Sequence, residues 1–576
     1  MYKGMDLVLS YLSAENTQYA FGVPGGALAE FMRAAQKDRR VEFIVSKHES
    51  GGAFMADGYA RVSGRLGVCV ATTGPGATNM LTGVAVAHAD GIPVLAIAGC
   101  TARTDVGRGA FQETSPRGVD AAALFRSVGA FGELVSDART LPVALGTAIR
   151  HCWAGKGGAS FIGIPTDIGA APSDPAWSPQ RTSQYRAESL GVDQAAVRRA
   201  AELVAEAKNP CLFVGFGARG LAEPNLLTRL AERLGAPAAT THKAKGLFPE
   251  DHPLSLKNFG VASSAWAMDW LTGSNVDLLI VIGSSLDEWA TGGWNAKLFE
   301  GRKILQIDID PCRVGRAAFV EHAVIGRVEP ILEALHRALD EMSIAEPDVE
   351  RRAAAVAEFK ASRPSTDEHH CTSLDTPLKP QRVVRELQRA LPDDAIVFVD
   401  SGNTTFWLLN HLSIGAGQRF FVSGPASMGY GFAASIGGKF AAPRQPVIAV
   451  GGDGALLMNG CELHTAVAHN LPIVWICFYD RKLGTVKHGN RMLIETEAYS
   501  ELDHFDPVRF AESVGAHAIR VDRPDGLEEA LPRALAMARP VLLCVHVDPD
   551  EAPPFGARIR GLRTQMKAEV IGGFGR

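Results

Sequence analysis

Short apolar runs rich in valine and isoleucine alternate along the chain with longer segments in which alanine, leucine and arginine recur at helical spacing. Most of the short runs end in glycine or a small polar residue. This alternation predicts repeated βαβ units, in which parallel strands are covered by helices on both faces of the sheet. The pattern recurs in three blocks, so we expect an α/β protein of three doubly wound domains with mainly parallel sheets.

Changes in composition mark the boundaries between the blocks. The first block ends near Pro172, where a stretch rich in proline and serine is typical of a linker, and the second begins with a helical segment. From about Leu332 to Pro377 the sequence is first helical and then charged and polar, as in a helix followed by a connector. A chain of 576 residues has room for three or four domains of about 150 residues. We predict domains at 1–172, 190–340 and 375–550, followed by a C-terminal tail at 551–576.

Two aspartates stand at the ends of neighbouring apolar runs in the third block. Asp453 lies between two glycines, after the run 446–450 and before a segment of helical spacing over 455–470. Asp480 ends the next apolar run. If the helix between them is a right-handed crossover, both carboxylates lie at one edge of a parallel sheet, where they could hold Mg²⁺ against a diphosphate. A helix cap at Asp453 and a turn at Asp480 explain the same residues, so both interpretations stay open on this motif alone.

The glycine-aspartate-glycine motif at 452–454, followed by Asp480, resembles the cofactor motif of thiamine diphosphate enzymes. Over about residues 6–549, the chain resembles their acetohydroxyacid (acetolactate) synthase-like branch. The resemblance implies thiamine diphosphate and Mg²⁺ as cofactors, and a pyrimidine-binding (PYR), a central and a diphosphate-binding (PP) domain. It also implies that Asp453, Asp480 and the backbone carbonyl of Lys482 bind the metal.

The resemblance assigns the acid–base group to Glu49, which follows a predicted strand and precedes a glycine-rich helix start. In the family, a glutamate at this place hydrogen-bonds N1′ of the aminopyrimidine and favours the imino tautomer that removes the C2 proton of the thiazolium. A carboxylic acid in an apolar cleft is suited to share such a proton, because burial raises its pKa. A solvated acid at a helix N-terminus is the alternative for Glu49, and the motif in the third block favours the catalytic interpretation.

Further motifs extend the resemblance. Gln112 resembles a synthase residue near the reacting carbon, where an uncharged amide can hold a carboxylate or carbonyl, although exposed loop polarity also explains it. Met428 resembles the apolar prop that bends the cofactor into a V shape, although a core methionine also fits. The implied catalytic residues are Glu49, Gln112 and Met428. The implied cofactor contacts are Pro24, Gly25, Asn79, Gly402, Asn403, Thr404, Met428, Gly452, Asp453, Gly454, Ala455, Asp480, Leu483, Gly484, Thr485 and Val486.

Several positions depart from the synthase pattern, and they bear on the substrate. Asp480 replaces the usual asparagine, as in the FAD-independent catabolic acetolactate synthases. The arginine that receives the carboxylate of the second keto acid falls on Trp289, and an indole cannot replace bidentate binding by a guanidinium. Gly489 and Ala130 stand where biosynthetic synthases carry a tryptophan that selects 2-ketobutyrate and a lysine.

The tail and the flavin cofactor stay open at this level. Arg558, Arg560 and Arg563 could supply an arginine to the acceptor if the tail forms a lid, and a disordered basic tail is the alternative. The sequences "GFGARG" and "IDIDP" in the middle block occur in flavin-containing members. They persist in relatives that bind no flavin, so FAD is uncertain from the sequence.

The function that the resemblance implies is a carboligase. It decarboxylates a 2-oxo acid such as pyruvate and transfers the acyl-carbanion unit to an acceptor carbonyl, as in acetolactate synthesis. A simple 2-oxo acid decarboxylase and another acyl transferase, such as a sulfoacetaldehyde acetyltransferase, are the alternatives. Thr72 and Thr73 stand where such decarboxylases carry a histidine, which favours ligation. A non-catalytic regulatory protein would need a broken catalytic set, and Glu49, Asp453 and Asp480 are all present.

Composition narrows the possible partners. The net charge of −5 provides no positive field that would attract nucleic acid. No apolar run reaches the roughly 20 residues of a membrane span, and the first residues lack the apolar core of a signal peptide. The nine cysteines are scattered without a CxxC pair, as in buried free thiols of a reducing compartment. We expect a cytoplasmic enzyme without nucleic-acid or membrane partners, and the resemblance implies a homodimer or homotetramer with active sites between subunits.

Overall fold

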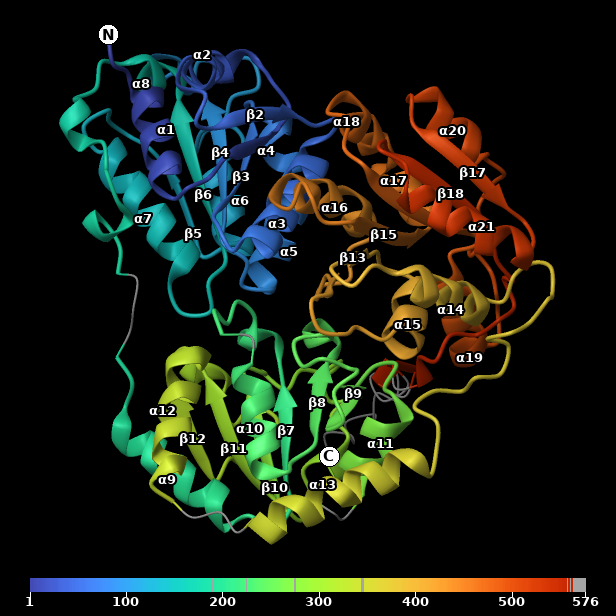
Figure 1. The fold of residues 1–576 in the computed structure, drawn as a ribbon. Helices are drawn as coiled ribbons and strands as arrows, with labels where there is room; N and C mark the ends of the chain where they lie inside the picture. The colour runs from blue at the N-terminus through green and yellow to red at the C-terminus, as the bar shows by residue number, and fades with distance from the viewer. Residues whose placement is uncertain are drawn as a thin grey trace, which may run out of the picture.

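The computed structural model contains three domains, each built on a six-stranded parallel sheet with helices around it (Figure 1). This confirms the prediction of an α/β protein with three doubly wound domains. The structure describes residues 1–187, 191–223, 225–273, 276–342, 346–556, 558–559 and 561–562, so the predicted roles of Arg560 and Arg563 lie outside the described residues. Within these ranges, no helix combines the length and the apolarity needed to cross a membrane.

The first domain has the strand order β2-β1-β3-β4-β6-β5. Its strands are β1 (Tyr19–Gly22), β2 (Glu42–Val45), β3 (Gly67–Ala71), β4 (Val94–Cys100), β5 (Phe131–Leu134) and β6 (Ala159–Pro165). Its helices are α1 (Gly4–Ala14), α2 (Ala29–Asp38), α3 (Glu49–Ser63), α4 (Pro75–Asn79), α5 (Leu81–Ala89), α6 (Ala121–Val128), α7 (Leu141–Trp153) and α8 (Thr166–Ala170). The apolar runs that form β3, β4 and β6 are buried along their whole length because helices cover both faces of the sheet.

The middle domain has the strand order β12-β11-β10-β7-β8-β9. Its strands are β7 (Pro210–Val214), β8 (Ala238–Thr241), β9 (Ser255–Phe259), β10 (Leu278–Ile282), β11 (Lys303–Asp308) and β12 (His322–Ile325). Its helices are α9 (Gln194–Glu206), α10 (Leu226–Leu234), α11 (Ala265–Thr272), α12 (Val328–Asp340) and α13 (Glu346–Ala361). The domain encloses an apolar core of its own.

The third domain has the strand order β14-β13-β15-β16-β18-β17. Its strands are β13 (Ile396–Val399), β14 (Arg419–Val422), β15 (Val447–Gly452), β16 (Ile473–Tyr479), β17 (His517–Val521) and β18 (Val541–His546). Its helices are α14 (Pro380–Ala390), α15 (Asn403–His411), α16 (Tyr430–Ala441), α17 (Asp453–Asn459), α18 (Leu463–Ala468), α19 (Gly484–Ile494), α20 (Pro507–Ser513) and α21 (Pro524–Leu535). After α21 the chain forms β18. Phe555 and Ile559, which lie in the tail, pack into the apolar core of this domain.

The helix expected over 455–470 differs from the structure because it is broken near its middle. α17 ends at Asn459, a 3-10 turn covers Gly460–Glu462, and α18 follows. Glycine is a poor helix former, and a Cβ at Gly460 would come within 2.9 Å of Leu456 Cδ1. After the break, the Glu462 side chain is fully buried.

The first and third domains share one apolar core, with α3 and α16 packed side by side at its centre (Figure 1). Two glycines permit this close approach. A Cβ at Gly58 would lie 1.9 Å from the carbonyl oxygen of Ala434, and a Cβ at Gly437 would lie 1.8 Å from that of Met55. The two helix backbones are therefore in direct contact at both positions.

Replacing Gly437 by alanine is expected to lower the free energy of unfolding by at least about 2 kcal/mol, because the added methyl group must push α3 and α16 apart. A lower urea midpoint of the first cooperative transition would report this loss. Gly526 in α21 is the matched control, since a Cβ there meets no atom within 4 Å. Gly526→Ala should leave the midpoint unchanged or raise it, and equal midpoints for Gly437→Ala and the unmodified protein would contradict the expected steric contact.

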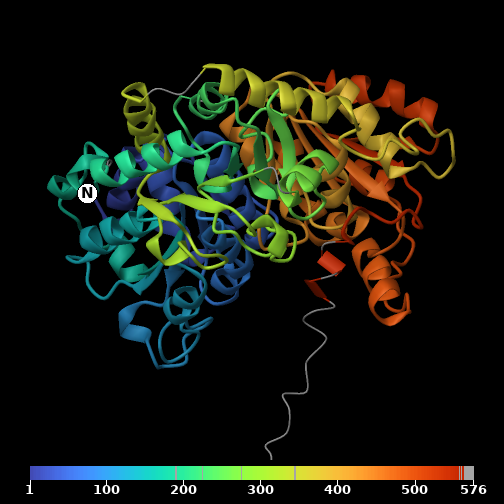
Figure 2. The ribbon, with the colours of Figure 1, turned by 90° about the horizontal axis from the view of Figure 1, so that it is seen from below.

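Buried charged side chains of the first domain form a hydrogen bond with the third domain and an ion pair with the middle domain. Arg61 binds Asp57 at 2.5 Å and Asp90 at 2.8 Å, all within the first domain. Tyr430 of the third domain donates a hydrogen bond to Asp57 at 2.7 Å, and Lys243 of the middle domain lies 3.3 Å from Asp90. Burial would raise the pKa of Asp90, but the charges of Arg61 and Lys243 outweigh it and lower the pKa to about 2. Figure 2, seen from the side of the middle domain, shows the first and third domains next to each other.

Candidate active site

The two predicted metal-binding carboxylates lie at neighbouring strand ends of the third sheet. β15 and β16 are adjacent and parallel, with Gly452 paired to Phe478. Asp453 begins α17 directly after β15, and Asp480 directly follows β16. The carboxyl edge of the sheet therefore carries both aspartates, as the crossover argument predicted.

Backbone N–H groups hold both carboxylates in place. Asp453 accepts hydrogen bonds from Gly454 N at 2.8 Å and from Arg481 N at 2.7 Å, and Asp480 accepts one from Lys482 N at 2.9 Å. Burial raises the pKa of Asp453 to about 6. Burial and the nearby Asp453 carboxylate raise the pKa of Asp480 to about 8. Because two such carboxylates repel each other, a divalent cation between them would stabilise their charged forms.

One cavity at this edge is lined by every cofactor contact and metal ligand that was predicted for the third domain, from Gly402 to Val486. The lining also includes residues that the sequence did not single out, among them Ser401, Trp407 and Glu551. The ammonium group of Lys482 pairs with Glu501 and has no lone pair for a metal, so the backbone carbonyl is the candidate metal ligand of Lys482.

Three loops meet closely in this cavity. A Cβ at Gly454 would lie 3.0 Å from both the Met428 methyl group and Leu483 Cδ2, so the predicted apolar prop lies directly over the 452–454 turn. Thr485 donates a hydrogen bond to Asn403 at 3.1 Å. The glycines in these loops leave the backbone N–H groups uncovered by side chains, so a large anion can approach them.

A buried carboxylate that the sequence analysis missed ties two of these loops together. Asp400 accepts hydrogen bonds from Ser401 N at 2.8 Å, Gly429 N at 2.8 Å and Gly431 N at 2.7 Å. Burial raises the pKa of Asp400 to about 7, although these backbone donors favour its charged form. The available signal was its position at the end of an apolar run, beside residues 402–404. Asp400 thereby holds the Met428 loop against the loop of Asn403.

The residues predicted in the first block form a second group, at the carboxyl edge of the first sheet. Glu49 begins α3 after β2 and is 9% exposed. Asn79 donates a hydrogen bond to Glu49 Oε2 at 2.9 Å. Gln112 accepts one from Thr73 at 3.2 Å, on the loop that leads to Asn79. A Cβ at Gly25 would lie 2.5 Å from the Thr72 side chain, which brings the Pro24-Gly25 turn to the same loop.

The two groups are separate within one chain. All residues that line the third-domain cavity belong to 380–551, so Glu49 and its neighbours do not contribute to it. Large apolar side chains are exposed beside each group. Phe111, next to Gln112, is 89% exposed, and Leu457 and Met458 on α17 are 53% and 57% exposed. Exposed apolar side chains of this kind are typical of a protein–protein interface.

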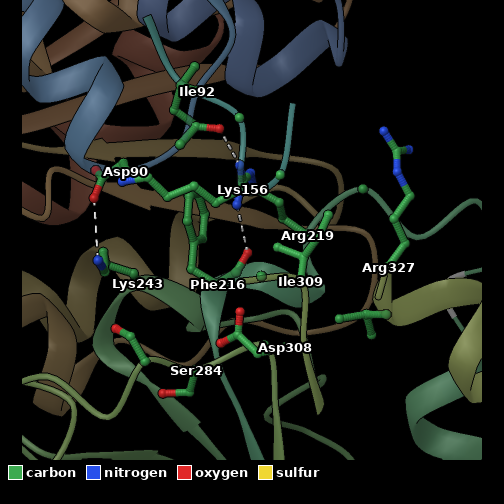
Figure 3. A pocket seen from close by; sticks show the side chains of 18 of the residues that line it. Asp90, Ile92, Lys156, Phe216, Arg219, Lys243, Ser284, Asp308, Ile309 and Arg327 are labelled. Carbon is green, nitrogen blue, oxygen red and sulfur yellow. Dashed lines mark hydrogen bonds and ion pairs between the residues drawn. The ribbon is translucent and has the colours of Figure 1, made fainter. Parts of the chain in front are cut away.

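A second cavity of about 590 Å³ lies where the first and middle domains face each other. Figure 3 shows Asp90 and Lys156 of the first domain facing Ser284 and Asp308 of the middle domain. The two motifs associated with flavin, at 215–220 and 307–311, both contribute to its wall. Arg219 of the first motif donates hydrogen bonds to the backbone oxygens of Gly91 and Phe216, so its guanidinium is already engaged.

Comparisons with known proteins cover nearly the whole chain. Residues 2–123, 197–335 and 400–545 match the N-terminal TPP binding, central and C-terminal TPP binding domains of thiamine pyrophosphate enzymes. The chain is 33% identical to the probable acetolactate synthase large subunit of Methanocaldococcus jannaschii, over 98% of this chain and 96% of the relative. It is 31% identical to the acetolactate synthase isozyme 2 large subunit of Escherichia coli, over 95% of each chain. A putative thiamine pyrophosphate-containing protein of Bacillus subtilis is 32% identical, over 94% of this chain and 90% of the relative. The protein therefore belongs to the thiamine pyrophosphate enzyme family and is an acetolactate synthase-like member of it.

Proposed function

We propose that the protein is a thiamine diphosphate- and Mg²⁺-dependent carboligase, which decarboxylates a 2-oxo acid such as pyruvate and transfers the acyl unit to an acceptor carbonyl. One observation carries the proposal: Asp453, Asp480 and Met428 line a single cavity at the carboxyl edge of the third sheet. This is the edge at which open parallel sheets bind their ligands. The acetolactate synthases among the relatives support carbon–carbon bond formation as the outcome.

The donor set of the cavity fits a magnesium ion and a diphosphate. Asp453, Asp480 and the carbonyl of Lys482 offer the hard oxygen ligands that Mg²⁺ prefers. Within the described ranges, no cluster of three or more histidine, cysteine, aspartate or glutamate side chains could hold a metal. A site with two carboxylates is therefore suited to an ion that takes its remaining ligands from phosphate oxygens, backbone and water. Asn403 and Thr404 would contact the diphosphate without adding negative charge.

When bound, thiamine diphosphate supplies an electron-accepting thiazolium ring, which allows a 2-oxo acid to lose CO₂. Glu49 would hold and pass on a proton at its carboxyl group, and Asn79 would orient that group through the 2.9 Å hydrogen bond. Gln112 would hold the carbonyl or carboxylate oxygen of the substrate through its uncharged amide. Met428 and Leu483 would exclude water from the reacting region.

We propose that the active unit is a homodimer, with a homotetramer as the larger assembly. Glu49 and Asp453 occupy separate groups in one chain, and each group carries exposed apolar side chains beside it. A second copy placed across the first would bring the Glu49 group of one chain to the Asp453 cavity of the other. Such an arrangement buries both apolar surfaces and completes two sites per dimer.

The acceptor is the less defined substrate. Trp289 packs against Phe406, with 5.8 Å between ring centroids, so it offers no charge to a carboxylate. Arg558 of the tail donates a hydrogen bond to the side chain of Glu288, the residue before Trp289, at 2.9 Å. A guanidinium has five N–H donors, and we propose that Arg558 takes over the carboxylate of an acceptor keto acid. Decarboxylation alone and acyl transfer to another acceptor are the competing outcomes.

Two further points, on the flavin cofactor and the location, complete the proposal. The transfer of an acyl unit involves no net oxidation or reduction, so no step of the proposed reaction uses FAD as an oxidant, and none takes place in the second cavity. The nine cysteines are all free, and all except Cys312 and Cys461 are buried. Free thiols fit a reducing compartment, which supports a cytoplasmic location.

Incubation with pyruvate, thiamine diphosphate and Mg²⁺ is expected to release CO₂ and form acetolactate in equal amounts, because one pyruvate serves as donor and a second as acceptor. Mass spectrometry of the products and a CO₂ assay check this. The Asp453→Asn variant is the control for cofactor-dependent turnover. Acetaldehyde as the main product would identify a decarboxylase instead, and a different 2-acyl-2-hydroxy acid, formed only when another 2-oxo acid is added, would identify a different donor or acceptor.

A further inference from the structure

We propose that Glu462 is a positioning residue for Glu49: its carboxylate clamps the backbone just before Glu49 and thereby fixes the direction of that side chain. The inference rests on the proposed function, in which Glu49 is the acid–base group. Glu462 lies in the 3-10 turn that breaks the expected helix after α17, and it is 0% exposed. It belongs to the third domain, whereas Glu49 belongs to the first.

In this contact, backbone N–H groups of the first domain donate hydrogen bonds to the Glu462 carboxylate of the third domain. Glu462 Oε1 accepts hydrogen bonds from Lys47 N at 3.0 Å and His48 N at 2.9 Å. Its Oε2 lies 3.1 Å from Lys47 N and accepts a hydrogen bond from the Thr465 hydroxyl at 2.9 Å. His48 is the N-cap of α3 and Glu49 is its first residue. The carboxylate therefore holds the two consecutive peptide groups, Ser46–Lys47 and Lys47–His48, that lead into the first turn of α3 and Glu49.

The first turn of α3 is shaped around this carboxylate. A Cβ at Gly51 would lie 2.2 Å from Glu462 Oε1, so glycine leaves the space that the carboxylate occupies. On the other side, Ser50 donates a hydrogen bond to Asn459 at 3.3 Å. Two residues of the third domain thus hold the residues directly before and after Glu49.

Opposing electrostatic effects act on the Glu462 carboxyl group. Burial raises its pKa, while the N–H groups of Lys47 and His48 and the Thr465 hydroxyl oppose that shift. The N-terminus of the 15-residue α3 carries a partial positive charge that attracts a carboxylate. The hydrogen bonds from Lys47, His48 and Thr465 all use a Glu462 oxygen as acceptor, which an ionised carboxylate satisfies best.

The clamp explains how Glu49 is preorganised in a subunit whose own cavity it does not reach. Asn79 fixes the end of the Glu49 side chain at Oε2, and Glu462 fixes the backbone from which the side chain starts. A catalytic group that is displaced by about 1 Å loses on the order of 100-fold in rate. Removing the clamp should therefore affect proton transfer by Glu49 and leave the Asp453 cavity able to bind its ligands.

The test compares Glu462→Ala and Glu462→Gln with Thr465→Val, which removes one hydroxyl donor and keeps both backbone contacts. In the metal- and cofactor-free protein, Glu462→Ala is expected to speed amide hydrogen exchange in residues 45–52. In the loaded protein, it should slow hydrogen–deuterium exchange at C2 of thiamine diphosphate by about 100-fold. The dissociation constant of thiamine diphosphate with Mg²⁺ should change less than about threefold. Glu462→Gln keeps one acceptor oxygen and should restore part of the C2 exchange rate, and Thr465→Val should behave almost as the unmodified protein.

Gly51→Ala provides an independent variant, because its methyl group would displace the Glu462 carboxylate without altering any acid. It should reproduce the slow C2 exchange of Glu462→Ala. The double variant should be no worse than either single one, since alanine at 462 leaves room for the new methyl group.

Three results overturn the inference. The first is an unchanged C2 exchange rate in Glu462→Ala, or in Glu462→Gln and Gly51→Ala if Glu462→Ala fails to fold. The second is a parallel loss of cofactor affinity and C2 exchange, which would indicate a general folding role. The third is unchanged amide exchange at 45–52. If the unmodified protein itself binds no thiamine diphosphate or shows no C2 exchange, the proposed function fails first, and the two failures are thus distinguishable.

Discussion

Asparagine in place of Asp453 is expected to weaken the binding of thiamine diphosphate with Mg²⁺ by about 100-fold or more, because even residues that only orient metal ligands contribute 10- to 100-fold. The Asp453 carboxylate accepts hydrogen bonds from the backbone N–H groups of Gly454 and Arg481, and Asp453 lines the same cavity as Asp480. Titration of the metal- and cofactor-free protein with thiamine diphosphate at fixed Mg²⁺, followed by calorimetry, measures the effect.

Two matched variants separate metal binding from helix capping. Asp506 caps α20 in the same domain by accepting hydrogen bonds from Val508 N and Arg509 N, and it pairs with Arg520 at 2.6 Å, so Asp506→Asn keeps a capping acceptor and removes only the charge. It should cost at most about 1 kcal/mol of stability and leave cofactor affinity unchanged. Asp480→Asn should also retain binding, since an amide still offers an oxygen ligand. If Asp453→Asn kept full affinity and resembled Asp506→Asn, the capping interpretation of Asp453 would be the correct one.

Glutamine in place of Glu49 is expected to preserve cofactor binding and to lower C2 hydrogen–deuterium exchange and turnover by about 10²- to 10⁴-fold, the usual contribution of a positioned acid–base group. Glutamine has nearly the same shape and can still accept the hydrogen bond from Asn79, but its amide cannot hold the transferable proton. Exchange at C2, measured by NMR after acid quenching, isolates this step from later ones. A Glu49→Gln variant that exchanges at the original rate would refute the acid–base role.

Mixing the two inactive variants tests whether the site is shared between subunits. In a mixed dimer, the Glu49→Gln chain supplies an intact Asp453 and the Asp453→Asn chain supplies an intact Glu49, so one of the two sites is complete. With random exchange of subunits, half of the dimers are mixed, and recovery of about a quarter of the original activity is expected. No recovery after verified subunit exchange would mean that Glu49 and Asp453 serve the same site from one chain.

Much of the fold could be read from the sequence because the central strands are continuous apolar runs. β3, β4, β10, β15 and β16 are buried on both faces, and each corresponds to a predicted run. Other strands carry a weaker signal. β9, β12 and β17 lie at sheet edges and contain polar residues, such as Lys257, His322 and Arg520, that interrupt an apolar run. β1 is only four residues long and ends on Gly22, so it forms no extended apolar run.

The residues of the candidate site likewise fall into those that the sequence indicates and those that only the structure shows. Residues that form local motifs, such as the 452–454 turn and the 402–404 loop, could be named in advance, and the structure brings those of the third domain to one cavity. Asp400 was overlooked although it ends an apolar run, whereas Asn459 and Glu462 could not be named, because their partners in the first domain are distant along the chain. Glu462 binds the amide of Lys47 across a separation of 415 residues. No local pattern reports such a pairing.

By itself, the sequence determined the fold class and the family, and it predicted which residues would hold the cofactor, because these inferences depend on local periodicity and on short motifs with fixed spacing. Only the tertiary structure decided how these residues are grouped. It separates Glu49 from the Asp453 cavity within one chain, places Arg558 beside Glu288, and breaks the helix after α17 so that Glu462 reaches the start of α3. These arrangements depend on the packing of whole domains against one another, where glycines such as Gly51 and Gly437 leave room for a distant group that their local sequence does not reveal.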